Sequence, residues 1–164
     1  AVCHELGHWL VLRRVGGRIQ RLHITVFGAE MQVDDRRISY GGELLTAAAG
    51  PVINLLLAAA MGLLGRWWEP LYLFAGAQLV LGAFNLLPAL PLDGGRILWL
   101  ALAWLTEPYT AQRVLSAVSL AVSLALLLGG GWFIWRLGGS PFLLVGAVGL
   151  TGWNLREIKL AKGG

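Results

Sequence analysis

The stretch LLTAAAGPVINLLLAAAMGLLG (44–65) decides the fold, because it is an uncharged apolar run long enough to cross a membrane. A helix needs about 20 apolar residues to span the hydrocarbon core. Hydrophobic residues make up 57% of the 164, and charged residues only 13%, against roughly 25% in an ordinary soluble domain. We predict an all-α polytopic membrane protein, a bundle of about four to six transmembrane helices. The other apolar runs are 71–87, 114–135 and the shorter 141–153.

The basic residues are spread unevenly over the predicted loops. If residues 71–104 cross once, one side holds most of the arginines and lysines, and the other holds only Arg66 and Arg136. Cytoplasmic loops carry such an excess, so we expect a multi-pass cell-membrane protein with its basic side in the cytoplasm. Nucleic acid is not an expected partner, because these residues lie at membrane borders without a nucleic-acid-binding motif. The basic side comprises Arg13, Arg14, Arg18, Arg21, Arg36, Arg37, Arg113, Arg156, Lys159 and Lys162.

Two segments interrupt the helical pattern. RLHITVF (21–27) alternates with a period of two, Gly28-Ala29 is typical of a turn, and EMQV (30–33) can form a second strand. We predict a short β-hairpin at the cytoplasmic membrane face. PALPLDGG (88–95) interrupts the apolar stretch 71–105 with two prolines and two glycines, which break a helix. Broken helices at membrane depth occur where they face protein or a water-filled cavity, so this break indicates a functional position.

HELGH (4–8) is a zinc-site pattern at the head of this apolar chain. On a helix, His4 and His8 share one face and can bind one ion together. Glu5 lies beside them, where it can reach a water on that ion and accept its proton. Cys3 is the only cysteine, and we expect it to pack as an apolar residue and not to bind the metal.

A catalytic zinc ion takes three protein ligands and keeps one position open. Asp93 is the candidate for the third ligand, because it lies in an apolar setting at the broken helix, where a carboxylate is costly and by default functional. One alternative is that Asp93 only caps the helix that restarts at residue 94. His23 is the rival ligand, although a histidine at the surface of the hairpin explains it more simply.

Three ordered motifs resemble the site-2 proteases, the zinc intramembrane metalloproteases. They are HELGH (4–8), AAGPVIN (48–54) and NLLPALPLDGGR (85–96), and the last is most similar to the subgroup of stage IV sporulation protein FB. The family carries one or more spans before its HExxH helix, so we expect N-terminal spans to be missing from this sequence.

The resemblance implies roles for individual residues. His4, His8 and Asp93 correspond to the zinc ligands, and Glu5 to the catalytic base. Asn85 is expected to help position the scissile carbonyl, and Asn54 to support the site or pack helices. From the residues alone, either asparagine is equally well a helix–helix hydrogen bond.

We therefore expect a zinc-dependent intramembrane endopeptidase that cleaves a membrane-protein substrate in or near its transmembrane segment, within the lipid bilayer. A non-proteolytic metal-binding scaffold and a transporter-like relative are the alternatives. We expect one domain over 1–164, with a catalytic core (1–105), accessory spans (106–155) and a basic tail (156–164). Ser116, Ser119 and Ser123 form a stripe in the accessory spans that either lines a water path or packs helices.

Overall fold

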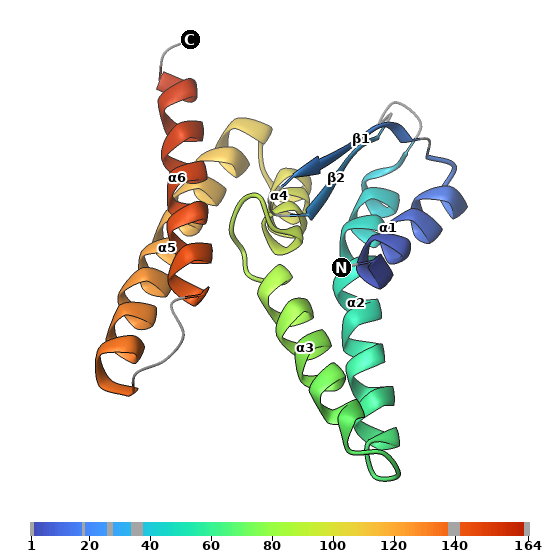
Figure 1. Cartoon of the computed structure of the whole chain (residues 1–164). Coiled ribbons are helices and arrows are strands. Elements are labelled where there is room, and N and C mark those ends of the chain that lie inside the picture. The colour runs from blue at the N-terminus through green and yellow to red at the C-terminus, as the bar shows by residue number, and fades with distance from the viewer. Residues whose placement is uncertain (1, 18, 26–27, 34–37, 138–141, 163–164) are drawn as a thin grey trace. The chain divides into compact units, whose positions relative to one another are not determined.

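The computed structural model describes residues 2–17, 19–25, 28–33, 38–137 and 142–162 (Figure 1). For residues 19–25, 28–33, 137, 142–144 and 157–162 it describes the backbone alone. The chain forms two compact units, Ala1–Leu86 and Leu87–Gly164, which are taken one at a time below. The interpretation of the chain as one domain stays a prediction.

The first unit opens with α1 (Val2–Arg14), the helix that carries HELGH. The helix ends where Gly16 adopts a φ of 83°, a backbone conformation that glycine reaches without steric cost. Strands β1 (Ile19–Thr25) and β2 (Gly28–Val33) follow and pair antiparallel. Thr25 pairs with Gly28, so the turn predicted at Gly28-Ala29 is wrong by two residues: Gly28 already belongs to β2. The connection itself, residues 26–27, lies outside the described residues.

Two long helices complete this unit. Helix α2 (Tyr40–Leu64) begins at Ser39, whose Oγ accepts a hydrogen bond from the Gly42 N–H at 3.2 Å. Helix α3 (Pro70–Asn85) starts with a proline, which has no N–H to leave unpaired there. Helices α1 and α3 both pack against α2 (Figure 1).

Small residues let these helices approach closely. A Cβ added to Gly7 of α1 would lie 2.8 Å from the Ala49 carbonyl oxygen of α2. A Cβ added to Gly82 of α3 would lie 3.1 Å from the Cβ of Asn54. The glycine within HELGH therefore sets how near the two histidines come to α2.

The second unit contains α4 (Asp93–Leu105), α5 (Pro108–Leu137) and α6 (Phe142–Lys162). Helix α5 contacts both α4 and α6. As expected from PALPLDGG, the chain is not helical between Asn85 and Asp93. Leu92 is the N-cap of α4, and its side chain makes no capping hydrogen bond. Asp93 is the first residue of the helix. Asp93 as a cap of this helix and Asp93 as a metal ligand both stay predictions.

Among the described residues, two helices are long and apolar enough to cross a membrane: Tyr40–Leu64 and Pro108–Arg136. The core helix of a soluble protein passes the same length test but is mostly buried. Here only 28% and 17% of the two apolar windows are buried. Large apolar side chains such as Leu56, Leu63 and Leu128 are exposed instead, which is the pattern of a lipid-facing surface.

The close approach of α1 and α2 makes a testable prediction. Gly7→Ala places a methyl group against a backbone oxygen that cannot turn away, so we expect a loss of about 1–3 kcal/mol in stability. Gly76→Ala in α3 is the control, because a Cβ there meets no atom within 4 Å. Thermal unfolding in detergent should show a lower Tm for Gly7→Ala alone, and equal Tm values for the two variants would contradict the packing described.

Candidate metal centre

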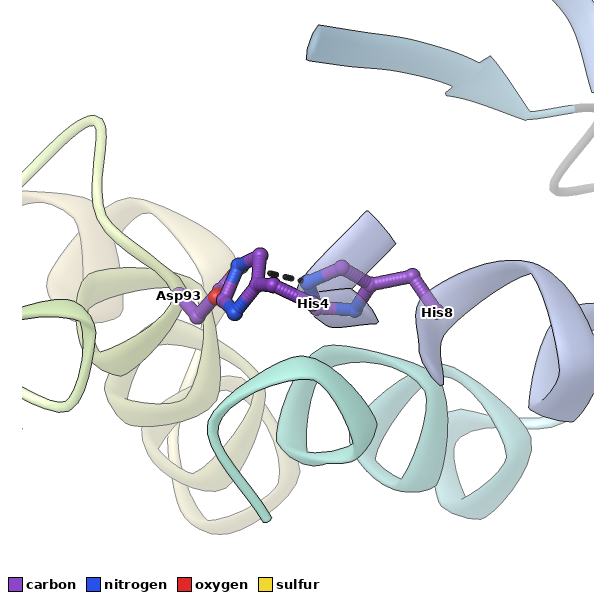
Figure 2. Close-up of side chains that lie close together, drawn as sticks. All are labelled: His4, His8 and Asp93. Atoms are coloured by element: carbon purple, nitrogen blue, oxygen red, sulfur yellow. Dashed lines mark hydrogen bonds between the residues drawn. The ribbon is translucent and has the colours of Figure 1, made fainter. Parts of the chain in front are cut away.

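Helix α1 turns both motif histidines toward α2. His4 and His8 lie one turn apart and are 6% and 8% exposed. Their rings meet edge to face with centroids 4.7 Å apart, and their Nε2 atoms lie 3.2 Å from each other (Figure 2). The spacing predicted from HELGH thus produces two buried imidazoles whose Nε2 atoms converge on one point.

One stripe of α2 receives these rings: Thr46, Gly50 and Asn54, which recur every four residues and are all buried. We call it the α2 stripe. A Cβ added to Gly50 would lie 2.7 Å from Cε1 of both His4 and His8. Only glycine leaves room for the two imidazoles at this point of α2.

The ends of the stripe orient the rings. The Nδ1 of His8 lies 2.7 Å from the Thr46 carbonyl oxygen. A carbonyl oxygen can only accept, so this Nδ1 carries the proton and the lone pair of His8 is on Nε2. Metal-ligating histidines are commonly held in this way by their second nitrogen. His8 is therefore in the tautomer that binds a metal through Nε2.

His4 is held by Asn54, which is fully buried between α1 and α3. The Asn54 Nδ2 lies 3.1 Å from the His4 Nδ1. In this arrangement the amide donates to His4 Nδ1, and His4 Nε2 donates to His8 Nε2. The Asn54 Oδ1 is buried and has no hydrogen-bond partner, which costs about 1–3 kcal/mol.

The unsatisfied Oδ1 of Asn54 is consistent with a metal site at the two histidines. A half-turn of the Asn54 amide brings Oδ1 to the His4 Nδ1, where it accepts a proton moved there from Nε2. Both Nε2 atoms then present lone pairs to one point, and the buried oxygen gains its partner. The residues of this unit thus have a self-consistent arrangement with two histidine ligands.

Three other residues singled out in the sequence, Glu5, Cys3 and His23, lie outside this pair of buried imidazoles. Glu5 is half-buried on α1, next to His4. Cys3 is exposed, so the expectation that it packs as an apolar residue is wrong: it lies on the side of α1 away from the buried histidines. His23 belongs to β1 and pairs with Glu30 along the backbone, and its side chain lies outside the described part of the chain.

Two further candidates lie at the ends of helices that flank the break. Asn85 is the last residue of α3, and its Nδ2 donates to the Leu81 carbonyl oxygen at 2.9 Å. Asp93 is the first residue of α4 and is half-buried; it is the third side chain drawn in Figure 2. The roles of Asn85 and Asp93 stay predictions.

Sequence reasoning missed two members of the α2 stripe. Thr46 contributes a backbone carbonyl, which no residue type reveals. Gly50 belongs to the AAGPVIN motif, and its spacing of four from Asn54 was the signal that could have found it. Residues four apart on a helix share a face, so the two mark a single contact surface for another helix.

The α2 stripe generates a prediction about metal binding. Gly50→Ala inserts a methyl group into the space of the two imidazoles, and we expect it to weaken zinc binding at least about tenfold by turning the rings. Gly62→Ala, on the same helix with no atom within 4 Å of the added Cβ, is the matched control. Competition with a chromophoric chelator measures the zinc affinity of both variants. An unchanged zinc affinity in Gly50→Ala would show that α2 does not shape the metal centre.

Comparison with known proteins shows which proteins this chain resembles. A profile of peptidase family M50 matches residues 60–129. The zinc metalloprotease MJ0392 of Methanocaldococcus jannaschii is 29% identical over 136 residues, which are 79% of this chain and 40% of that protein. Stage IV sporulation protein FB of Bacillus subtilis is 29% identical over 136 residues, 80% of this chain and 46% of that protein. The chain thus spans less than half the length of these relatives.

The fold agrees with the sequence match. The solved structure of the site-2 protease from Methanocaldococcus jannaschii superposes with a TM-score of 0.74 at 26% identity, covering 95% of this chain and 72% of that one. This likeness extends over both units of the chain, beyond the residues matched by the profile. Residues 60–129 thus match peptidase family M50, and the chain resembles zinc metalloproteases in sequence and a site-2 protease in fold.

Proposed function

We propose that the chain is the catalytic part of a zinc-dependent intramembrane endopeptidase, which cleaves a membrane-protein substrate in or near a transmembrane segment. The observation that carries the proposal is the buried histidine pair, with one ring already in its metal-binding tautomer. The names of the relatives support zinc and proteolysis. A non-proteolytic scaffold would need the metal ligands but would have no use for Glu5.

His4, His8 and Asp93 are the proposed zinc ligands. Two imidazoles and a carboxylate are a ligand set that catalytic zinc uses. His23 is the alternative third ligand.

In the proposed hydrolysis of a peptide bond, the zinc ion and the protein side chains have separate roles. Zinc, when bound, lowers the pKa of water and polarises a carbonyl group. Glu5 accepts the proton of the attacking water and later delivers a proton to the leaving amine nitrogen. Asn85 is proposed to hold the scissile carbonyl through its side-chain amide. To do so, its Nδ2 must leave the Leu81 carbonyl oxygen that it contacts now.

Asn54 is proposed to position His4. In the zinc-bound form its Oδ1 accepts from the His4 Nδ1–H and keeps the Nε2 lone pair aimed at the ion. This role uses the half-turn of the amide and satisfies the oxygen that is otherwise orphaned. The predicted alternative of helix packing does not require an acceptor at this place.

The site-2 protease family is membrane-embedded, and we propose a multi-pass arrangement of about four to six spans in the full protein, with the centre and the β-hairpin toward the cytoplasm. Arginines stacked on aromatic rings at helix ends support it, because such pairs are suited to the membrane–water interface. The pairs are Arg13 over Trp9, Arg66 over Trp67, Arg113 over Tyr109 and Arg136 over Trp135.

Glu5→Gln and Asp93→Ala together test the assigned roles. We expect Glu5→Gln to keep its zinc and lose cleavage by at least about a hundredfold, the size of a general-base contribution. Asp93→Ala should lose both zinc and cleavage. Zinc per chain and turnover of a transmembrane substrate are measured on the same preparations of the full-length protein. Full zinc content in Asp93→Ala would reassign the third ligand, with His23→Ala the next variant to examine.

Asn54 makes a prediction that separates an acceptor from a donor. Asn54→Asp keeps an oxygen acceptor for the His4 Nδ1–H and loses the donor, whereas Asn54→Leu loses both. We expect zinc affinity to fall by about tenfold or more in Asn54→Leu and to change much less in Asn54→Asp, by chelator competition. Equal losses in the two variants would show that Asn54 serves as a donor or as packing, against the proposed orientation.

A further inference from the structure

Leu90, in the loop that precedes α4, has both of its backbone polar groups bound by side chains of distant helices. Its N–H donates to the Ser119 Oγ of α5 at 2.9 Å. Its carbonyl oxygen accepts from the Asn154 Nδ2 of α6 at 3.4 Å. Residues 29 and 64 positions further along the chain thus hold one residue of the PALPLDGG loop from two sides.

The bound side chains also bind each other. The two N–H groups of Asn154 Nδ2 are shared among Leu90, the Ser123 Oγ at 3.1 Å and the Leu150 carbonyl oxygen of the same helix at 2.9 Å. The Ser123 Oγ in turn donates to the Ser119 carbonyl oxygen at 2.8 Å. Ser119 and Ser123 are fully buried and Asn154 is 2% exposed. Buried polar groups in apolar helices are costly unless they are satisfied, so this cluster and the Leu90 backbone stabilise one another. We call the three residues Ser119, Ser123 and Asn154 the Leu90 clamp.

The held loop is rigidly joined to Asp93. The Leu92 N–H donates to the Ala89 carbonyl oxygen at 2.8 Å, and the Gly95 N–H donates to the Leu92 carbonyl oxygen at 3.0 Å. Gly95 also packs so tightly that a Cβ would lie 2.7 Å from the Ala89 carbonyl carbon and oxygen. Asp93 lies between these contacts, so a displacement of Leu90 displaces the Asp93 backbone as well.

We infer that the Leu90 clamp positions Asp93: Ser119, Ser123 and Asn154 fix the loop from which this carboxylate reaches the metal. The inference rests on the proposed function, in which Asp93 is a zinc ligand. It gives α5 and α6 a part in the metal centre, in place of the accessory role expected for residues 106–155. Ser119 and Ser123 of the serine stripe of α5 belong to the clamp, and this fits the expectation that the stripe packs helices.

Ser119→Ala and Asn154→Leu in the full-length protein test this inference. Each leaves one Leu90 group without its side-chain partner, so we expect faster hydrogen exchange in residues 88–95 of the metal-free chain and zinc affinity lower by about tenfold. The probe is the zinc ion alone, in competition with a chelator. Ser116→Ala on α5 and Thr151→Val on α6 are matched controls: Ser116 is outside the clamp, and Thr151 bonds only within its own helix turn.

Combination with Asp93→Ala shows whether the clamp acts through Asp93. In that background Ser119→Ala should cost no further zinc affinity, because the carboxylate that it positions is gone. An equal loss in both backgrounds, or faster exchange with unchanged zinc affinity, would overturn the inference and leave the clamp a structural element. Full-length wild type that binds no zinc would instead overturn the metal centre itself, and this inference with it.

Discussion

The hydrogen bond from the His8 Nδ1 to the Thr46 carbonyl oxygen is the interaction on which the rest of the centre depends. It ties the HELGH helix to α2 and at the same time fixes the proton of His8 on Nδ1, so that the lone pair is on Nε2, the nitrogen next to His4. The contact requires α1 to lie very near α2, and Gly7 and Gly50 provide that nearness by removing side chains from both helices. Helix packing and ligand chemistry therefore impose the same constraint on these residues.

That constraint explains which parts of the centre could be predicted from the sequence. His4 and His8 share a helix face by periodicity alone, and the prolines before Asp93 and the glycines after it indicate a break in the helix. Residue type and local spacing carry this information. The helical character of the chain was predicted in the same way from the apolar runs. The hairpin turn was placed at Gly28 because glycine is typical of turns, although here Gly28 begins a strand.

The supporting contacts could not be predicted, because they join residues far apart in the chain through groups that the sequence does not distinguish. Thr46 contributes a backbone carbonyl, and every residue has one. Ser119 and Asn154 bind the backbone of Leu90, a residue whose side chain plays no part in these contacts. Apolar helices with occasional serine or asparagine are ordinary in membranes. Only the three-dimensional arrangement shows which of them hold a functional loop.

The chemistry of these supporting groups suits an apolar surrounding. In many metal sites a carboxylate holds the second nitrogen of a histidine ligand, but each additional buried charge is costly in hydrocarbon. Here a carbonyl oxygen and an amide hold the two imidazoles, and hydroxyl and amide groups hold the loop of Asp93. All are neutral. The supporting groups thus add no charge to the two carboxylates of the proposed centre, those of Asp93 and Glu5.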